Sequence, residues 1–166
     1  MSPKRHAFCS FCGARYSSDA WPRSCGSCKA TIWENPIPVS VIVQPVKDAS
    51  GYSVLLVRRA IPPKIGELAL PGGYVDRKES GAEAACRELR EECGIICKRP
   101  EDLSFFGERI DRDKNLLLLF WVAPTIDLSA LPTLSPNDEV SELVVTEKSM
   151  ELAFPYHTDA LHRYLG

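Results

Sequence analysis

Apolar residues follow two different periods along the chain, and the shorter period predicts strands. Two apolar runs, "PVSVIVQPV" and "YSVLLVRRA", flank the turn sequence "DASG" and predict a hairpin whose first strand covers about 38–46. Three later runs also predict strands, namely "LSFFGERI", "NLLLLFWVAP" and "SELVVT". Because helical segments lie between these strands, the pattern indicates an α/β or α+β domain around a mixed sheet.

The longer period predicts two helices. Ser80 followed three residues later by Glu83 forms a capping box, so the first helix should begin just after Ser80 and end at Gly94. At 100° per residue, one stripe of this helix is apolar and should face the core: Ala82, Cys86, Leu89 and Cys93. A second helix should include "DALHRYL" at the end of the sequence.

The first helix also carries three carboxylates on one side. Glu88, Glu91 and Glu92 lie within about 100° of one another, where like charges repel. Carboxylate oxygens on a rigid element suit Mg²⁺ or Mn²⁺. The small Ala84 and Ala85, one turn earlier on that side, should leave space for a metal–phosphate complex. The alternative is an ordinary solvated acidic face.

Length and charge limit the classes of protein to which this chain can belong. The chain has 166 residues, which suits one domain with a small appendage, and its net charge is −2. Residues 1–33 carry five basic residues against one acidic residue. The sequence has no apolar run long enough to span a membrane, and its first residues lack the apolar core of a secretion signal. We therefore expect a cytoplasmic protein without a membrane partner, whose seven cysteines are reduced.

Four of those cysteines form two pairs, Cys9-x2-Cys12 and Cys25-x2-Cys28. Two such pairs supply the four thiolates of a structural Zn²⁺ site, and the alternatives are two disulfides or four unrelated cysteines. We expect a zinc ribbon at 1–34 and a second domain at 35–166. The aromatic residues of the ribbon should pack around the metal, and the alternative is base stacking on nucleic acid.

Residues 73–95 resemble a complete Nudix box, G-x5-E-x7-R-E-U-x-E-E-x-G-U, in which U is a bulky aliphatic residue. All nine positions match: Gly73, Glu79, Arg87, Glu88, Leu89, Glu91, Glu92, Gly94 and Ile95. The resemblance implies an α/β/α sandwich with a mixed sheet, and a hydrolase that cleaves nucleoside diphosphate derivatives with Mg²⁺ or Mn²⁺. It further implies that Glu88, Glu91 and Glu92 bind the metal. Arg87 would orient these carboxylates, and Glu79 would support the loop and helix.

Because a zinc ribbon precedes the box, the chain is similar to two groups within the Nudix family. These are the NADH pyrophosphatase branch and relatives that act on FAD or ADP-ribose. The NADH-cleaving branch has the motif S-Q-P-W-P-F-P after the box, where this chain reads "LSFFGERIDRDKN". FAD or ADP-ribose is therefore the favoured substrate, with NAD(H) still open. The alternatives are removal of a nucleotide cap from RNA ends and a nucleotide-sensing binding module. A homodimer is compatible with any of these functions.

Residues outside the box should complete the site. "NDEVSELVV" resembles the E-x-x-E segment of Nudix enzymes, so Glu139, after a long loop at 124–139, is the first candidate for the general base and Glu142 the second. The alternative is that both residues decorate a surface loop. Gly72 and Gly73 should approach the substrate. Three aromatic residues are candidates for stacking a base, or else belong to the core: Tyr74, Phe106 and Trp121.

Overall fold

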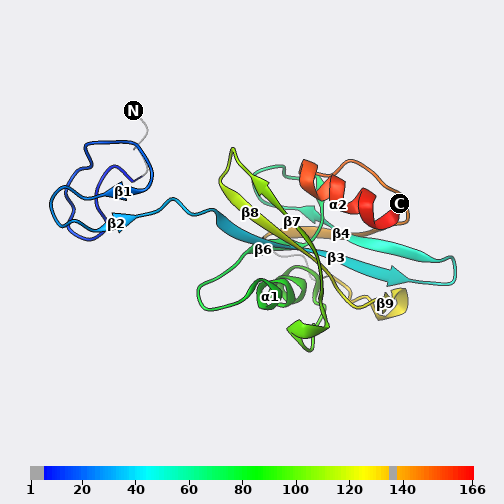
Figure 1. The fold of residues 1–166 in the computed structure, drawn as a ribbon. Helices are drawn as coiled ribbons and strands as arrows, with labels where there is room; N and C mark the ends of the chain where they lie inside the picture. The colour runs from blue at the N-terminus through cyan, green and yellow to red at the C-terminus, as the bar shows by residue number, and fades with distance from the viewer. Residues whose placement is uncertain (1–5, 135–137) are drawn as a thin grey trace. The chain divides into compact units, whose positions relative to one another are not determined.

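The computed structural model describes residues 6–134 and 138–166, and the chain divides into two compact units (Figure 1). The units are Met1–Pro36 and Ile37–Gly166. The first contains the four paired cysteines and the second contains the long strands and both helices. The predicted boundary between residues 34 and 35 lies close to this division and stays a prediction.

The smaller unit is built from two similar turns. In each turn, the first cysteine donates its backbone N–H to a carbonyl five residues ahead: Cys9 to Ala14 at 2.8 Å, and Cys25 to Ala30 at 2.8 Å. The second turn joins β1 (Arg23–Ser24) to β2 (Thr31–Ile32), which pair antiparallel. Such short strands bury little apolar surface, so this unit depends on another source of folding free energy.

The larger unit is organised by a mixed sheet. Its five main strands are β3 (Ile37–Lys47), β4 (Tyr52–Arg59), β7 (Ser104–Asp111), β8 (Leu116–Val122) and β10 (Val140–Thr146), in the order β10-β4-β3-β8-β7. Three short strands extend it, β5 (Leu68–Ala69), β6 (Gly72–Tyr74) and β9 (Ile126–Asp127). β3 runs parallel to β8 and β9, and the other pairs are antiparallel. The predicted β3–β4 hairpin is confirmed.

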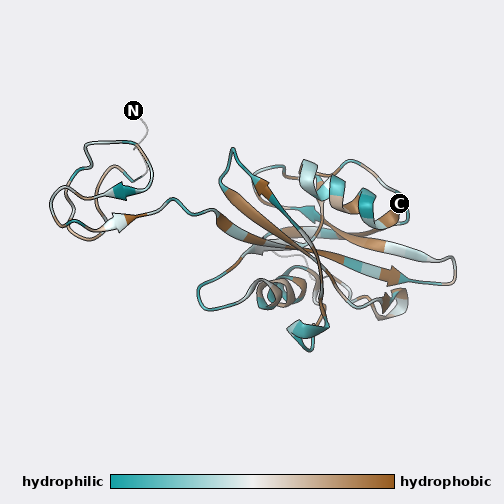
Figure 2. Ribbon diagram, in the orientation of Figure 1, coloured by the Kyte–Doolittle hydropathy of each residue, from teal (hydrophilic) through white to brown (hydrophobic). Residues whose placement is uncertain are grey.

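Helices cover both faces of the sheet. α1 (Gly81–Cys93) lies on one face and α2 (Pro155–Leu165) on the other (Figure 1). Alternate residues of β3 enter two separate cores, with Ile42 on the α1 side and Val41 and Val43 on the α2 side. The strands between the helices are accordingly the most apolar part of the ribbon drawing (Figure 2). Two short 3-10 helices, η1 (Pro100–Asp102) and η2 (Leu128–Ala130), lie in the connections. The α/β/α sandwich is confirmed.

The caps of α1 agree with the sequence. Ser80 and Glu83 form the reciprocal capping box, and Gly94 adopts the left-handed conformation at the C-terminal cap, with φ of 69°. The expectation for Ala84 and Ala85 is wrong. Both side chains are completely buried against the rest of the domain, so they leave no space for a metal–phosphate complex.

One prediction about the cysteines is also wrong. Cys86 and Cys97 form a disulfide, with Cα atoms 5.1 Å apart, so these two residues are not free thiols. Cys86 is only partly buried, whereas Leu89 and Cys93 of the same stripe are fully buried in the core. Over the described residues, neither helix has the length and apolarity needed to cross a membrane.

Candidate carboxylate site and zinc site

A close approach of β6 to α1 defines the carboxylate site. β6 pairs antiparallel with β3, which places Gly73 opposite Ser40. A Cβ atom on Gly73 would lie 2.3 Å from Oε1 of Glu88, and a Cβ on Gly72 would lie 2.3 Å from the carbonyl oxygen of Ser40. Gly72 is therefore required for β6 to lie this close to the backbone of β3, and a side chain at Gly73 would displace the Glu88 carboxylate.

Ser40 is a residue of this site that sequence reasoning missed. Its buried hydroxyl donates a hydrogen bond of 2.6 Å to the carbonyl of Gly81, the first residue of α1. This bond attaches the start of the helix to the central strand. The available signal was a lone polar residue inside the apolar run "PVSVIV".

The guanidinium of Arg87 connects the carboxylates. It donates to Glu79 at 2.8 Å, to Glu88 at 2.7 Å and to Glu91 at 3.1 Å. A further hydrogen bond of 2.8 Å reaches the carbonyl of Tyr74 on β6. The bond from Arg87 is the main cause that lowers the pKa of Glu79. Arg87 thus ties the loop, the strand and the helix together through its planar set of donors.

Two of the three helix carboxylates are buried. Glu88 and Glu92 are only 6% and 7% exposed. Burial raises the pKa of Glu92 to about 8, against the opposing effect of a 2.8 Å hydrogen bond from the Gly72 N–H. Burial also raises the pKa of Glu88, and Arg87 offsets part of this increase. The ionised form of both carboxylates is therefore costly without more positive charge nearby.

A divalent cation would supply that charge. In the described part of the chain, only the four paired cysteines bring three or more ligand atoms within 4.8 Å of one another, so the carboxylates are adjacent but do not converge on one point. Glu91 is half exposed and can turn away from Arg87. The carboxylate oxygens of Glu88, Glu91 and Glu92 fit Mg²⁺ or Mn²⁺, because these ions prefer oxygen ligands and retain several waters.

Glu139 lies close enough for its charge to act on this cluster, whereas Glu142 is bound by an arginine of β4. The charge of Glu139 raises the pKa of both Glu88 and Glu92, and its backbone carbonyl accepts a hydrogen bond of 2.7 Å from Ala60. Glu142 is held by Arg58 of β4 at 2.6 Å. Residues 135–137 of the loop that precedes Glu139 lie outside the described residues.

Arg59 is a second residue that the sequence did not single out. Its positive charge lowers the pKa of Glu92, opposing the effect of burial. Its guanidinium donates to the carbonyl of Pro63 at 2.8 Å, which fixes it at the end of β4. The sequence signal was weak, because basic residues at strand ends are common.

The three aromatic candidates are not gathered at one place. The strand register places Tyr74 opposite Val39, on the α2 side of the sheet, where its ring is exposed. Phe106 lies on that side too, with the guanidinium of Arg163 over its ring. Trp121 is on the α1 side and packs against Phe105 at 5.3 Å between ring centroids. A single stacking site made by all three residues is excluded.

The cysteine pairs meet in the smaller unit. The sulfur of Cys9 lies 3.7 Å from that of Cys28, and the sulfur of Cys12 lies 3.6 Å from that of Cys25. A tetrahedral Zn²⁺ with Zn–S bonds of about 2.3 Å requires sulfurs about 3.8 Å apart. Backbone N–H groups of Phe11 and Cys12 lower the pKa of Cys9, which favours the thiolate. The four residues therefore fit structural zinc, and they exclude the alternative of four unrelated cysteines.

The packing of the ribbon aromatics agrees with the prediction only in part, since the buried hydroxyl of Tyr16 lies beside Cys9. Phe8, Phe11 and Trp33 are 59%, 72% and 65% exposed, so they do not form a core around the metal. Trp21 instead packs under the guanidinium of Arg23, whose distance from the ring centroid is 4.4 Å. Lys4 and Arg5, which contribute to the basic charge of this unit, lie outside the described residues.

We expect the purified protein to contain about one zinc per chain. Cys25→Ser should abolish zinc binding and unfold Met1–Pro36, because a unit with this little core takes its stability from the metal. Elemental analysis would measure zinc, and NMR amide dispersion would report folding of each unit. The matched control is Cys93→Ser, whose sulfur lies in the core of the larger unit. Full zinc content in Cys25→Ser would contradict the assignment.

Comparisons with known proteins agree with this geometry. A model of the NUDIX domain matches residues 36–164. The chain is 30% identical over 116 residues to the ADPR responsive transcriptional repressor NtrR of Acinetobacter baylyi, covering 66% of this chain and 46% of that protein. It is 42% identical over 60 residues to the ADP-ribose pyrophosphatase of Methanocaldococcus jannaschii, covering 36% and 35% of the two chains.

A crystal structure of a NUDIX hydrolase from Nitrosomonas europaea superposes with a TM-score of 0.70 at 24% identity. The alignment covers 95% of this chain and 89% of that one, and at this identity it supports the fold alone. The chain spans between about a third and just over half of the length of the curated relatives it matches.

Proposed function

This chain belongs to the NUDIX family, and from that membership we propose that it hydrolyses the pyrophosphate linkage of a nucleoside diphosphate derivative. The observation that carries the proposal is the set of carboxylates gathered around Arg87 and Gly73, two of them buried at a cost that a divalent cation would offset. A chain that only senses a nucleotide has no need of two destabilised carboxylates.

Each residue of the carboxylate site has its own role in the proposed reaction. Glu88, Glu91 and Glu92 would hold the cation, which would supply positive charge for the pyrophosphate and lower the pKa of a water. Arg87 keeps Glu88 and Glu91 on one side of α1, and Glu79 in turn orients Arg87 through two hydrogen bonds. Gly72 orients Glu92 by its N–H. Glu139 would receive the proton of the attacking water, because its charge acts on Glu88 and Glu92 while it lies outside the box.

ADP-ribose and FAD are the favoured substrates. Support for ADP-ribose comes from the two relatives whose names refer to it, one as the substrate of a pyrophosphatase and one as the signal of a repressor. FAD is favoured because the segment after the box lacks the NADH-type motif. Cleavage would release AMP together with ribose 5-phosphate or FMN. The four cysteines would hold Zn²⁺ as a structural ion, separate from the Mg²⁺ or Mn²⁺ that the reaction would use.

We expect the purified chain to cleave ADP-ribose or FAD with a higher kcat/KM than NADH. The assay compares the three compounds with Mg²⁺ and with Mn²⁺ and separates the products by chromatography. Activity should disappear with a chelator and return with either cation. A clear preference for NADH would refute the ranking of substrates, and no cleavage of any of the three would refute the proposed reaction.

A further inference from the structure

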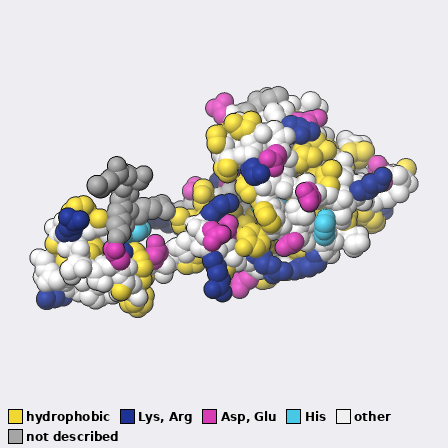
Figure 3. Space-filling model, turned by 90° about the horizontal axis from the view of Figure 1, so that it is seen from above, with side chains coloured by type: hydrophobic (Ala, Val, Ile, Leu, Met, Phe, Trp, Pro, Cys, Tyr) yellow, Lys and Arg dark blue, Asp and Glu magenta, His cyan; other side chains and the backbone are white. Residues whose placement is uncertain are grey.

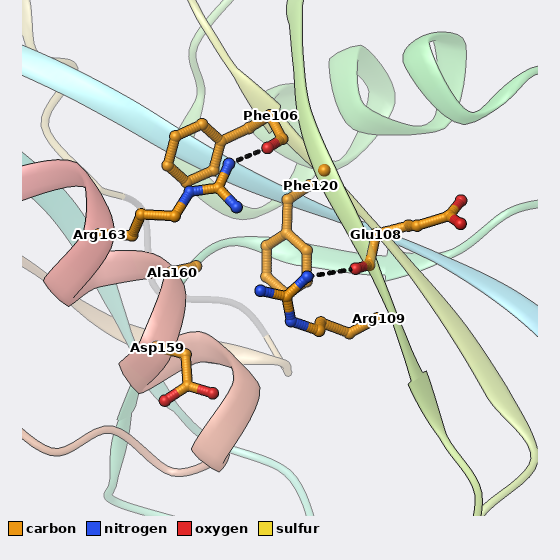
Figure 4. A pocket seen from close by; sticks show the side chains of 8 residues that line it. Phe106, Glu108, Arg109, Phe120, Asp159, Ala160 and Arg163 are labelled. Atoms are coloured by element: carbon orange, nitrogen blue, oxygen red, sulfur yellow. Dashed lines mark hydrogen bonds between the residues drawn. The ribbon is translucent and has the colours of Figure 1, made fainter.

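Basic and acidic side chains lie interspersed over the α2 face of the larger unit, so this face as a whole favours no ligand charge (Figure 3). The hollow between β7 and α2 has about 20 Å³ of water-accessible space, which is enough for about one water molecule. Its two arginines bind carbonyls of β7, since Arg163 donates to Phe106 and Arg109 to Glu108 (Figure 4). Cations with room for a ligand lie instead at the end of the sheet that carries the carboxylate site.

Two cations from distant parts of the chain approach the ring of Phe154, the residue before α2. The guanidinium of Arg59, at the end of β4, lies 5.1 Å from the ring centroid. The ammonium of Lys114, in the turn between β7 and β8, lies 5.4 Å from it. The ring of His157 packs on Phe154 with centroids 5.0 Å apart. Burial is the main cause that lowers the pKa of His157 to about 3, so its ring is neutral and adds no third positive charge.

The backbone places Arg59 beside the carboxylate site. The N–H of the next residue, Ala60, donates to the carbonyl of Glu139 at 2.7 Å. Phe154 packs against the core cluster on the α1 side of the sheet, which is the side of the carboxylate helix. The positive charge of Arg59 also lowers the pKa of Glu92. The cations around Phe154 and the carboxylates of α1 therefore belong to one region of the larger unit.

Both cations keep donors for a ligand. The Nε of Arg59 donates to the carbonyl of Pro63 at 2.8 Å and its Nη2 approaches that of Ile61 at 3.4 Å, which leaves Nη1 for another acceptor. Among the residues that the structure describes, no carboxylate forms an ion pair with Arg59. Lys114 is exposed, and its Nζ lies 3.7 Å from Oδ2 of Asp111, a long contact for an ion pair. Either side chain can therefore bind an anion without losing a short internal ion pair.

A phosphate group fits these two cations. Glu88, Glu91 and Glu92 together with one divalent cation still carry net negative charge, which repels a pyrophosphate. A pyrophosphate that binds here therefore needs further positive charge close to the carboxylates. Arg59 supplies it with planar N–H donors that suit phosphate oxygens, and Lys114 supplies it as a point charge on a flexible stem.

We propose that Arg59 and Lys114 form a phosphate position beside Phe154, which binds the phosphate of the substrate that the divalent cation does not hold. The assignment of this phosphate to the substrate rests on the proposed hydrolysis. A free phosphate compound offers the same chemistry, and the two sources differ in their effect on the reaction.

The binding test uses α,β-methylene-ADP with Mg²⁺, because its P–C–P linkage cannot be hydrolysed and calorimetry then reports binding alone. Arg59→Gln should weaken binding about tenfold and Lys114→Gln about threefold, because a partly buried guanidinium forms stronger charge-assisted hydrogen bonds than an exposed ammonium. Arg59→Lys, which keeps the charge but not the planar donors, should bind with an affinity between those of Arg59→Gln and the unchanged chain. The matched control is Lys148→Gln, which removes an exposed lysine after β10, at the opposite end of β4 from Arg59, and should leave the affinity unchanged.

Steady-state kinetics with ADP-ribose then identify the source of the phosphate. A KM raised about tenfold in Arg59→Gln and about threefold in Lys114→Gln, at nearly unchanged kcat, assigns the position to the substrate. An unchanged KM with weaker binding of the analogue overturns that assignment and leaves a position for a free phosphate compound. Equal affinity for the analogue in the unchanged chain and both variants, at equal thermal stability, would overturn the proposal itself, as would a lack of binding to the unchanged chain. The calorimetric result does not depend on turnover, so failure of the proposed hydrolysis would be recognised separately.

Discussion

Glu92→Gln should lower kcat for pyrophosphate cleavage by roughly two to four orders of magnitude while the fold is retained. The amide has the shape of the carboxylate and can still accept the hydrogen bond from Gly72, so the approach of β6 to α1 is preserved. It lacks the negative charge that a bound cation requires. Initial rates at saturating substrate and Mg²⁺, with circular dichroism to check the fold, would measure the effect.

The matched control lies on the same helix. Glu83 is exposed and accepts the Ser80 N–H in the capping box, and glutamine can replace glutamate at that position. Glu83→Gln should therefore leave kcat within about twofold of the unchanged chain, since it alters neither the cap nor the cluster. Equal and mild effects at positions 83 and 92 would mean that α1 carries an ordinary acidic surface.

Glu92→Gln should also reveal the free-energy cost of burying the Glu92 carboxylate. Its pKa is about 8 in the folded, cation-free protein, against an ordinary value of 4.5. At a pH between these two pKa values, Glu92 has lost its proton in the unfolded chain but retains it in the folded chain. The free energy of unfolding therefore falls as the pH rises. Without divalent cations, Glu92→Gln should melt at a higher temperature than the unchanged chain at pH 9. Near pH 4 the difference should vanish.

Glu139→Gln should lower kcat by about 10²–10⁴-fold if this residue accepts the proton of the attacking water. KM should change little, because proton transfer concerns the transition state more than binding. The residue lies at the surface, so the substitution should not affect the melting temperature. A pH–rate profile that loses its acidic limb in the variant would identify the missing group as a base.

Glu142→Gln is the comparison for Glu139→Gln. It removes the charge that Arg58 binds at the edge of the sheet, and this exposed ion pair contributes about 1 kcal/mol or less. Its kcat should stay close to that of the unchanged chain. If Glu139→Gln were equally active, the proton acceptor would have to be one of the box carboxylates.

Local sequence signals predicted the parts of the site that are local in the chain. Ser80, Glu83 and Gly94 fix the ends of α1, so the helical face with Glu88, Glu91 and Glu92 followed directly. The burial of Ala84 and Ala85 could not be predicted, since helical periodicity gives a direction but not what covers it. The Cys86–Cys97 disulfide likewise depends on how the segment after Gly94 returns to the helix.

Contacts between strands were harder to predict. A register shift between Phe105 and Gly107 changes which aromatic residue of β7 faces α2. Phe106 consequently lies on the α2 side, while Phe105 pairs with Trp121 on the other side. Such irregularities are set by tertiary packing, and alternation along one strand does not reveal them.

The central position of β3 has a consequence for the order in which the protein is assembled. β3 is the first strand of the larger unit to leave the ribosome, yet its parallel partner β8 begins at Leu116, after most of the domain has been synthesised. Pairing across such a sequence separation slows folding, because the loop must close before the contact stabilises it. The cysteine turns need only residues up to Cys28. During synthesis, the metal-bound unit can therefore be complete while β3 is still without its parallel partner β8.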